Sequence, residues 1–185
     1  MGLVISTGNE LLNPIKGYID QFLPDCCDRL LRSAPYHTLP LTTIPESDIL
    51  GLIDGVLTIR LTANFIRIGV IQFKSWKRPV MSTITIEDPR YILQKNEYTR
   101  GGNSKPVVVL KQAAGYKVLE CYTVTSGEQS QSPELTYVAK KTPEEIPDIL
   151  IPALSYLVAS EVFQAIEKKD LSEKALTSFA LNLII

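Results

Sequence analysis

The segment Val56–Val80, with the sequence VLTIRLTANFIRIGVIQFKSWKRPV, decides the fold that we predict for this 185-residue chain. Residues Val56–Leu61 alternate in character, as the residues of a half-buried β-strand do. Phe65–Phe73 is rich in β-branched and aromatic residues, which favour a second strand. We expect the chain to turn near Thr62–Asn64. The second strand then leads into an exposed aromatic and basic turn, Ser75–Pro79.

Short apolar segments separated by turn residues continue the strand pattern beyond this stretch. We predict four further strands: Val80–Ile86, Pro106–Lys111, Lys117–Val124 and Leu135–Ala139. The one helix expected among them is Pro89–Lys95, with Asp88 as its cap and proline at its first position. Six short strands with little helix between them indicate an antiparallel sandwich or an open barrel rather than a parallel sheet.

The N-terminal region predicts a helix over residues 9–33. Its apolar residues recur at three- and four-residue steps and fall on one face: Leu11, Leu12, Ile15, Ile19, Phe22 and Leu23. Asn13 can cap this helix if it begins just before Pro14. Pro24 should kink or restart it. Residues 36–50 contain two prolines and predict an extended connection with a short turn at Ser47–Leu50.

The C-terminal region predicts two helices. The first, residues 147–168, has a broad apolar stripe made of Leu150, Leu154, Leu157, Val158, Val162, Phe163 and Ile166. The second, Leu171–Leu183, should be capped by Asp170 with Glu173 completing a capping box. The apolar residues 181–185 would be a liability on the surface of a monomer, so we expect them to pack in the bundle or on a neighbouring subunit.

These patterns together predict an α+β chain. Helices at the two ends of the sequence must cover each other, because neither buries its stripe alone. We expect residues 1–50 and 141–185 to form one helical bundle. Residues 51–140 would then be an antiparallel β insertion, built as a sandwich or an open barrel.

Charge is distributed unevenly along the chain, although the net charge is only −1. Residues 56–117 contain eleven Lys and Arg against three Asp and Glu, which is a net charge of +8. Residues 1–55 have a net charge of −4 and residues 118–185 one of −5. A basic middle fits a solvated mixture of charges, contact with nucleic acid, or docking on an acidic partner surface.

Residues with recognisable catalytic or metal-binding spacing are missing from the sequence. The chain has one histidine, His37, and three cysteines, of which Cys26 and Cys27 are adjacent and cannot readily bridge each other. We interpret the cysteines, Cys121 included, as small core residues in a reducing compartment. We predict no catalytic, cofactor or metal site, no signal peptide and no membrane-spanning run of about 18 residues.

Two groups of residues are candidates for contact with partners. The first is basic and aromatic and would face DNA or a subunit interface: Lys74, Trp76, Lys77, Arg78, Arg100 and Lys105. A turn whose tryptophan covers the edge of the sheet is the alternative for Trp76. The second group is apolar and would pack between subunits: Phe163, Leu183, Ile184 and Ile185.

Several short segments carry a family resemblance through their order along the chain. They are residues 61–67 (LTANFIR), 76–80 (WKRPV), 88–91 (DPRY), 94–101 (QKNEYTRG) and 104–107 (SKPV), and the helical pair 153–180 adds to them. With these segments, the chain resembles the head-to-tail connector (adaptor or ring) proteins of tailed bacteriophages. It is most similar to those of crAss-like, short-tailed phages.

The resemblance implies a structural virion protein without catalytic residues or cofactors. Such a protein forms a ring, usually of twelve copies, in the neck of the particle. The ring docks below the portal protein, surrounds the DNA channel and gives other neck or tail proteins a platform. We therefore expect a homo-oligomer made in the host bacterial cytoplasm, with non-specific contact to genomic DNA and no membrane. The alternative is a sequence-tolerant nucleic-acid-binding module that uses the basic β region.

Overall fold

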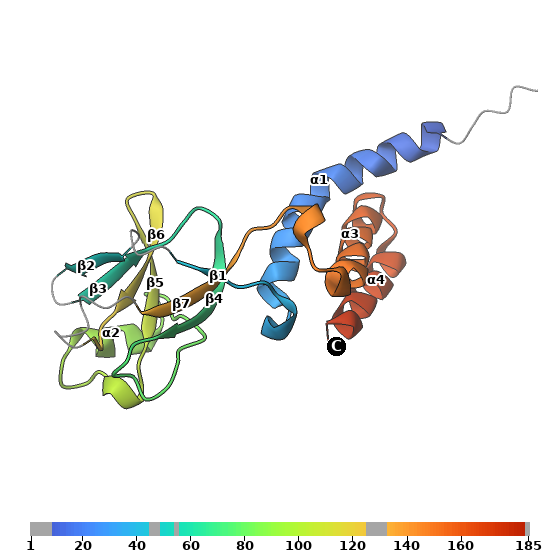
Figure 1. The fold of residues 1–185 in the computed structure, drawn as a ribbon. Coiled ribbons are helices and arrows are strands. Elements are labelled where there is room, and N and C mark those ends of the chain that lie inside the picture. Colours follow the sequence, from blue (N-terminus) through green and yellow to red (C-terminus); the bar gives the residue numbers. More distant parts are fainter. Residues whose placement is uncertain (1–8, 45–48, 54–55, 125–132, 184–185) are drawn as a thin grey trace, which may run out of the picture. The chain divides into compact units, whose positions relative to one another are not determined.

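A computed structural model describes residues 9–44, 49–53, 56–124 and 133–183 (Figure 1). The chain divides into two compact units. One is helical and joins Met1–Pro40 to Lys140–Ile185, and the other, Leu41–Ala139, contains the strands. The predicted α+β class is confirmed. The boundary expected at residue 50 lies instead after Pro40, because residues 42–43 and 49–53 pair with strands of the second unit.

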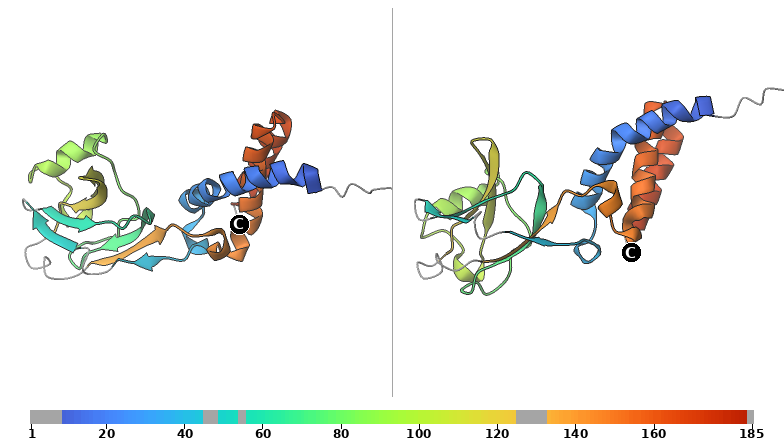
Figure 2. Two further views of the ribbon diagram at one scale, coloured as in Figure 1. Left: turned by 90° about the horizontal axis from the view of Figure 1, so that it is seen from above. Right: turned by 45° about the horizontal axis from the view of Figure 1, so that its top comes forward.

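Three helices form the framework of the helical unit in the described residues. They are α1 (Asn9–Ser33), α3 (Ile151–Ala165) and α4 (Lys169–Asn182). Both α1 and α4 pack on α3 (Figure 2). The buried face of α3 consists of Ala153, Leu154, Leu157, Val158, Ser160 and Val162. Leu154, Leu157, Val158 and Val162 belong to the predicted stripe, and Leu150 just before the helix is also buried. The end of the stripe differs from the prediction, because Phe163 is half-buried and Ile166 is exposed.

Helix α1 differs from the prediction in where it begins, whereas the kink predicted from Pro24 agrees with the bend of the helix. It begins at Asn9, so Asn13 lies inside the helix and the predicted cap is wrong. The helix also continues through Pro24. A proline in the interior removes one backbone hydrogen bond and clashes with the preceding turn, which bends a helix. Figure 1 shows that the axis of α1 changes direction between its two halves.

The predicted ends of the C-terminal helices need correction. A single 3₁₀ turn, Asp148–Leu150, precedes α3, and Pro152 then lies in the first turn of α3, where no backbone donor is needed. Helix α4 begins one residue before the predicted cap, Asp170, and Lys168 takes the cap position without a side-chain hydrogen bond. Asp170 instead lies in the first turn, where the helix dipole favours its negative charge.

Small residues bring α4 close to α3. Ser172 and Ala175 are its buried residues, and the Ser172 hydroxyl lies 3.0 Å from the Ser160 hydroxyl of α3. A buried hydroxyl needs a partner, so each serine satisfies the other. This contact fixes the register between the two helices.

The described strands form two antiparallel sheets. The strands are β1 (Thr42–Thr43), β2 (Ile49–Ile53), β3 (Val56–Arg60), β4 (Phe65–Gln72), β5 (Val108–Ala113), β6 (Tyr116–Cys121) and β7 (Glu134–Ala139). One sheet has the order β1-β7-β4 and the other has the order β2-β3-β6-β5. Strands β3 and β4 are neighbours in sequence, yet they belong to different sheets. The turn at residues 62–64 therefore connects two sheets.

The predicted strand Val80–Ile86 is wrong. Val80 makes a single antiparallel bridge with Ile71 of β4, and Ile84 makes a single parallel bridge with Val109 of β5. The segment passes from one sheet to the other, so it cannot pair continuously with either. Residues 36–50 were expected to be only a connection, but they supply β1 and the start of β2; of the turn predicted there, residues 47–48 lie outside the described residues.

Other local predictions for the β unit are confirmed. Strands form at the predicted positions of β3 to β7, and β5 and β6 are paired across Ala114–Gly115. Helix α2 (Pro89–Lys95) begins where predicted, and the Asp88 carboxylate accepts a hydrogen bond of 2.9 Å from the Arg90 amide. A sandwich or an open barrel, the finer architecture expected from the sequence, stays a prediction.

The core of the β unit draws on both sheets. Leu57, Ile59 and Leu119 come from one sheet, and Phe65, Ile68, Ile71, Leu135 and Tyr137 come from the other. Trp76 belongs to the same cluster and is only 3% exposed, so the prediction of an exposed tryptophan is wrong. Its indole N–H donates to the carbonyl oxygen of Thr123, and its ring lies 4.9 Å from that of Phe73.

The cysteines occupy the cores of both units. Cys26, Cys27 and Cys121 are all free and buried, as the sequence predicted for small core residues. Burial raises the pKa of the Cys26 thiol to about 11, and it also raises the pKa of the Cys121 thiol. A thiolate is the reactive form, so these side chains serve as packing groups.

The position of Trp76 predicts a strong effect on stability. Replacing it with alanine (Trp76→Ala) should lower the free energy of unfolding by about 3–5 kcal/mol, because a large cavity opens in the shared core. Urea unfolding followed by circular dichroism measures the change. Lys74→Ala, two residues away and exposed, is the matched control and should change the value by less than about 0.5 kcal/mol. Equal stability of the two variants would contradict this assignment of Trp76 to the core.

Candidate interaction surfaces

The N-terminal half of α1 carries apolar side chains that the helical unit does not bury. Five of the residues from 15 to 23 are apolar or aromatic, and none of them is buried: Ile15, Tyr18, Ile19, Phe22 and Leu23. Tyr18 and Phe22 stack on each other with ring centroids 6.2 Å apart. By contrast, Cys26, Cys27, Leu30 and Leu31 in the second half are fully covered. Among the apolar α1 side chains that the structure describes, from residue 14 onwards, the unit therefore covers those of the second half fully and those of the first half only in part.

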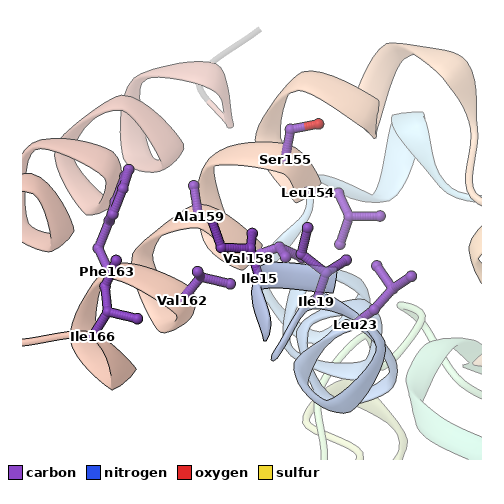
Figure 3. Close-up of a pocket in the computed structure, with 10 residues that line it drawn as sticks. All are labelled: Ile15, Ile19, Leu23, Leu154, Ser155, Val158, Ala159, Val162, Phe163 and Ile166. Carbon is purple, nitrogen blue, oxygen red and sulfur yellow. The ribbon is translucent and has the colours of Figure 1, made fainter. Parts of the chain in front are cut away.

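An apolar groove runs between this half of α1 and α3 (Figure 3). Its volume is about 420 Å³. Ile15, Ile19 and Leu23 line it from α1, and Leu154, Ser155, Val158, Ala159, Val162, Phe163 and Ile166 line it from α3. Ser155 is the only polar member of this lining. We call this feature the α1–α3 groove.

The chemistry of the α1–α3 groove suits side-chain packing. None of the described residues that line it is titratable, so this part of the chain places no general acid or base in the groove. Ile15 and Ile19 are 41% and 37% exposed, and Ile166 at the end of α3 is 37% exposed. Apolar surface of this kind gains free energy when another apolar surface covers it.

The predicted subunit-packing residues have different outcomes. Phe163 is half-buried and lines the α1–α3 groove, so it lies in a surface available to a partner. Leu183 follows α4 and is also half-buried. Ile184 and Ile185 lie outside the described residues.

Four of the predicted basic candidates lie on two loops that are joined through their backbones. Lys74, Lys77, Arg78 and Lys105 are all exposed, and the Lys77 amide donates to the Asn103 carbonyl oxygen at 2.9 Å. This bond holds the turn 74–79 against the loop 101–105. We call this set of four cations the basic loop pair.

Trp76 and Arg100 are unsuited to the contact role predicted for them. Trp76 is buried in the core. Arg100 is half-buried and its guanidinium donates to the Tyr122 carbonyl oxygen at 2.8 Å, while lying 5.8 Å from the centre of the Tyr122 ring. These contacts attach the segment after α2 to the sheet. Arg100 therefore has a structural contact in this unit.

Helix α2 presents apolar residues outwards and a polar residue inwards, which is not expected from its sequence. Gln94 is buried, and its side-chain Oε1 has no hydrogen-bond partner within the part of the chain that the structure describes. Ile92 is 72% exposed and Leu93 is also exposed. The spacing of the apolar residues gave no signal of this arrangement, because adjacent apolar residues also occur on buried helix faces, as Leu157 and Val158 do on α3.

A partly exposed charge pair braces the outer face of the β5–β6 pair. The Glu120 carboxylate accepts hydrogen bonds from the Lys111 ammonium at 3.0 Å and from the Tyr122 hydroxyl at 2.8 Å. Burial and the hydrogen bond to Glu120 raise the pKa of Tyr122, and that carboxylate also raises the pKa of Lys111. In the described residues no three His, Cys, Asp or Glu side chains gather as metal ligands would.

One helix meets the size and composition of a membrane span. Residues Asp148–Ala165 have a mean hydropathy of 1.2 over 18 residues. The segment contains the 3₁₀ turn and Pro152, and six of its α3 residues are buried against other helices. The buried core helix of a soluble protein has the same length and apolar content. This feature alone is weak evidence for a membrane.

Comparison with known proteins gives no family for the chain. No protein-family model matches it, and no curated protein matches it either. The function must therefore be argued from the α1–α3 groove and the basic loop pair.

The two halves of α1 should respond differently to substitution. Ile15→Gln and Ile19→Gln should each lower the free energy of unfolding by less than about 1 kcal/mol, because both side chains are already partly in water. Leu30→Ala in the covered half should lower it by about 2–5 kcal/mol. Thermal or urea unfolding of the protein at low concentration provides the measurement. A large loss for Ile15→Gln or Ile19→Gln would mean that this half of α1 is part of the core.

Proposed function

We propose that this protein is a structural subunit that works as a homo-oligomer and has no catalytic role. The observation that carries the proposal is the α1–α3 groove, together with the unburied half of α1. A helix that extends an apolar face beyond its own unit is typical of a chain whose packing is completed by a neighbour. The residues that line the groove offer shape and apolar area.

The resemblance of the sequence to phage proteins specifies the assembly that we propose. In this proposal the chain is a ring protein of the head-to-tail connector in a tailed phage, with twelve copies expected from the family. The helical unit would dock laterally and against the portal protein, and the β unit would meet neck or tail proteins. The basic loop pair would face DNA or an acidic neighbour, since its four cations are exposed.

Sizing in solution tests the assembly. We expect mass photometry of the purified protein to show particles of many copies, alone or after addition of the portal protein. Ile19→Lys should reduce these particles strongly, because it places a charge in the apolar groove. Tyr98→Lys adds the same charge at a position of the other unit that is 97% exposed, and it is the control for lateral assembly. A protein that stays monomeric alone and with portal would refute the proposal.

A second candidate function is non-specific binding of nucleic acid. The hydrogen bond between Lys77 and Asn103 favours it, because it brings the loops of Lys74, Lys77, Arg78 and Lys105 together. Clustered exposed cations neutralise phosphates, and the affinity then falls steeply with salt concentration.

Charge reversal tests this second candidate. The triple variant Lys74→Glu, Lys77→Glu and Arg78→Glu should lose retention of a double-stranded oligonucleotide at low salt. The unaltered protein should lose about 10³-fold in affinity between 50 and 200 mM salt if six phosphates are contacted. With fewer contacts, the logarithm of this loss falls in proportion to the number of phosphates. The control is a triple reversal of Lys140, Lys168 and Lys169 in the helical unit. Equal retention by both triple variants would exclude the basic loop pair as the binding surface.

A further inference from the structure

Helix α4 carries a second partly apolar surface, separate from the α1–α3 groove. Residues at steps of three and four along its exposed side form a stripe made of Leu171, Lys174, Ser178 and Leu181. Leu171 is 43% exposed and Leu181 is 64% exposed. No residue of α4 lines the groove. The helical unit thus has an apolar groove and, elsewhere, a helix with outward leucines.

Charged residues beside the two surfaces occur in opposite order. On α1, Lys16 and Asp20 are exposed and lie one helical turn apart, flanking the row Ile15, Ile19 and Leu23. On α4, Asp170 and Lys174 are exposed and have the same four-residue spacing. When the two helices run parallel, Asp170 faces Lys16 and Lys174 faces Asp20. Both pairs are then attractive.

We propose that the α1–α3 groove of one copy receives α4 of a second copy, with α4 running parallel to α1 of the copy that holds it. Leu171 covers the apolar lining beside the two charge pairs, and these pairs set the register. The contact joins two different surfaces, so every copy keeps one free groove and one free α4 for further copies. Such heterologous contacts generate rings when the rotation closes. This inference rests on the proposed homo-oligomer and names its interface.

A charge exchange across the interface tests the pairing. Asp20→Lys alone and Lys174→Glu alone should each weaken assembly by about 10-fold or more, because each places like charges face to face. In the double variant Asp20→Lys with Lys174→Glu, opposite charges face each other again with their positions exchanged. This variant should recover most of the assembly. Mass photometry over a dilution series measures all three. Lys169→Glu is the matched control for the change at Lys174, and it should assemble as the unaltered protein does.

Cross-linking provides a measurement that does not depend on charge. We expect a mixture of an Asp20→Cys protein and a Lys174→Cys protein to form a disulfide-linked dimer under mild oxidation, whereas neither protein forms it alone. Both positions are exposed, so folding should be kept, and circular dichroism verifies this.

The outcomes separate this inference from the proposed function. Restored assembly in the double variant and a mixed cross-link support the parallel contact between α4 and the groove. If the single variants assemble as well as the unaltered protein, or if the double variant does not recover assembly, the proposed interface is wrong. The proposed homo-oligomer is not contradicted by either result. A protein that is monomeric at every concentration, with and without portal, overturns both.

Discussion

Packing of α1 and α4 against α3 is the interaction on which the helical unit depends. The apolar face of α3 contains Leu154, Leu157 and Val162, and it faces helices that lie at opposite ends of the sequence. Neither terminal segment can bury its own stripe, so the chain must bring its two ends together. The strands of residues 41–139 are consequently an insertion between two parts of one helical unit.

The same packing leaves apolar surface uncovered. Among the α1 side chains that the structure describes, from residue 14 onwards, the fully buried ones begin at Cys26, whereas Ile15 and Ile19 stay exposed. Extending an apolar stripe beyond the available cover has no benefit for a solitary subunit, because exposed apolar area favours non-specific association. It is useful in a protein that completes its packing with further copies. The proposed homo-oligomer follows from this excess of apolar surface.

In the β unit, local sequence patterns predicted where strands form better than how they pair. Alternation and β-branched content correctly predicted where β3 to β7 form, and Asp88 with Pro89 correctly predicted the start of α2. Which strands pair with each other could not be predicted as well, because pairing depends on contacts between residues far apart in the sequence. Strands β3 and β4 separate into two sheets, and the segment after Trp76 crosses between them with one bridge to each. A short apolar segment such as Val80–Ile86 looks the same whether it pairs along its length or only at two residues.

The candidate surfaces were predicted in part. The sequence by itself determined that the segments at both ends carry apolar helical stripes, that Phe163 lies on one of them, and that cations gather in the middle of the chain. Only the tertiary structure decided that Trp76 is buried and hydrogen-bonded, that Arg100 is occupied by a carbonyl oxygen, and that Gln94 points inwards while Ile92 points outwards. The physical reason is that composition and spacing report the chemical character of a side chain. Burial depends on which distant segment arrives to cover that side chain.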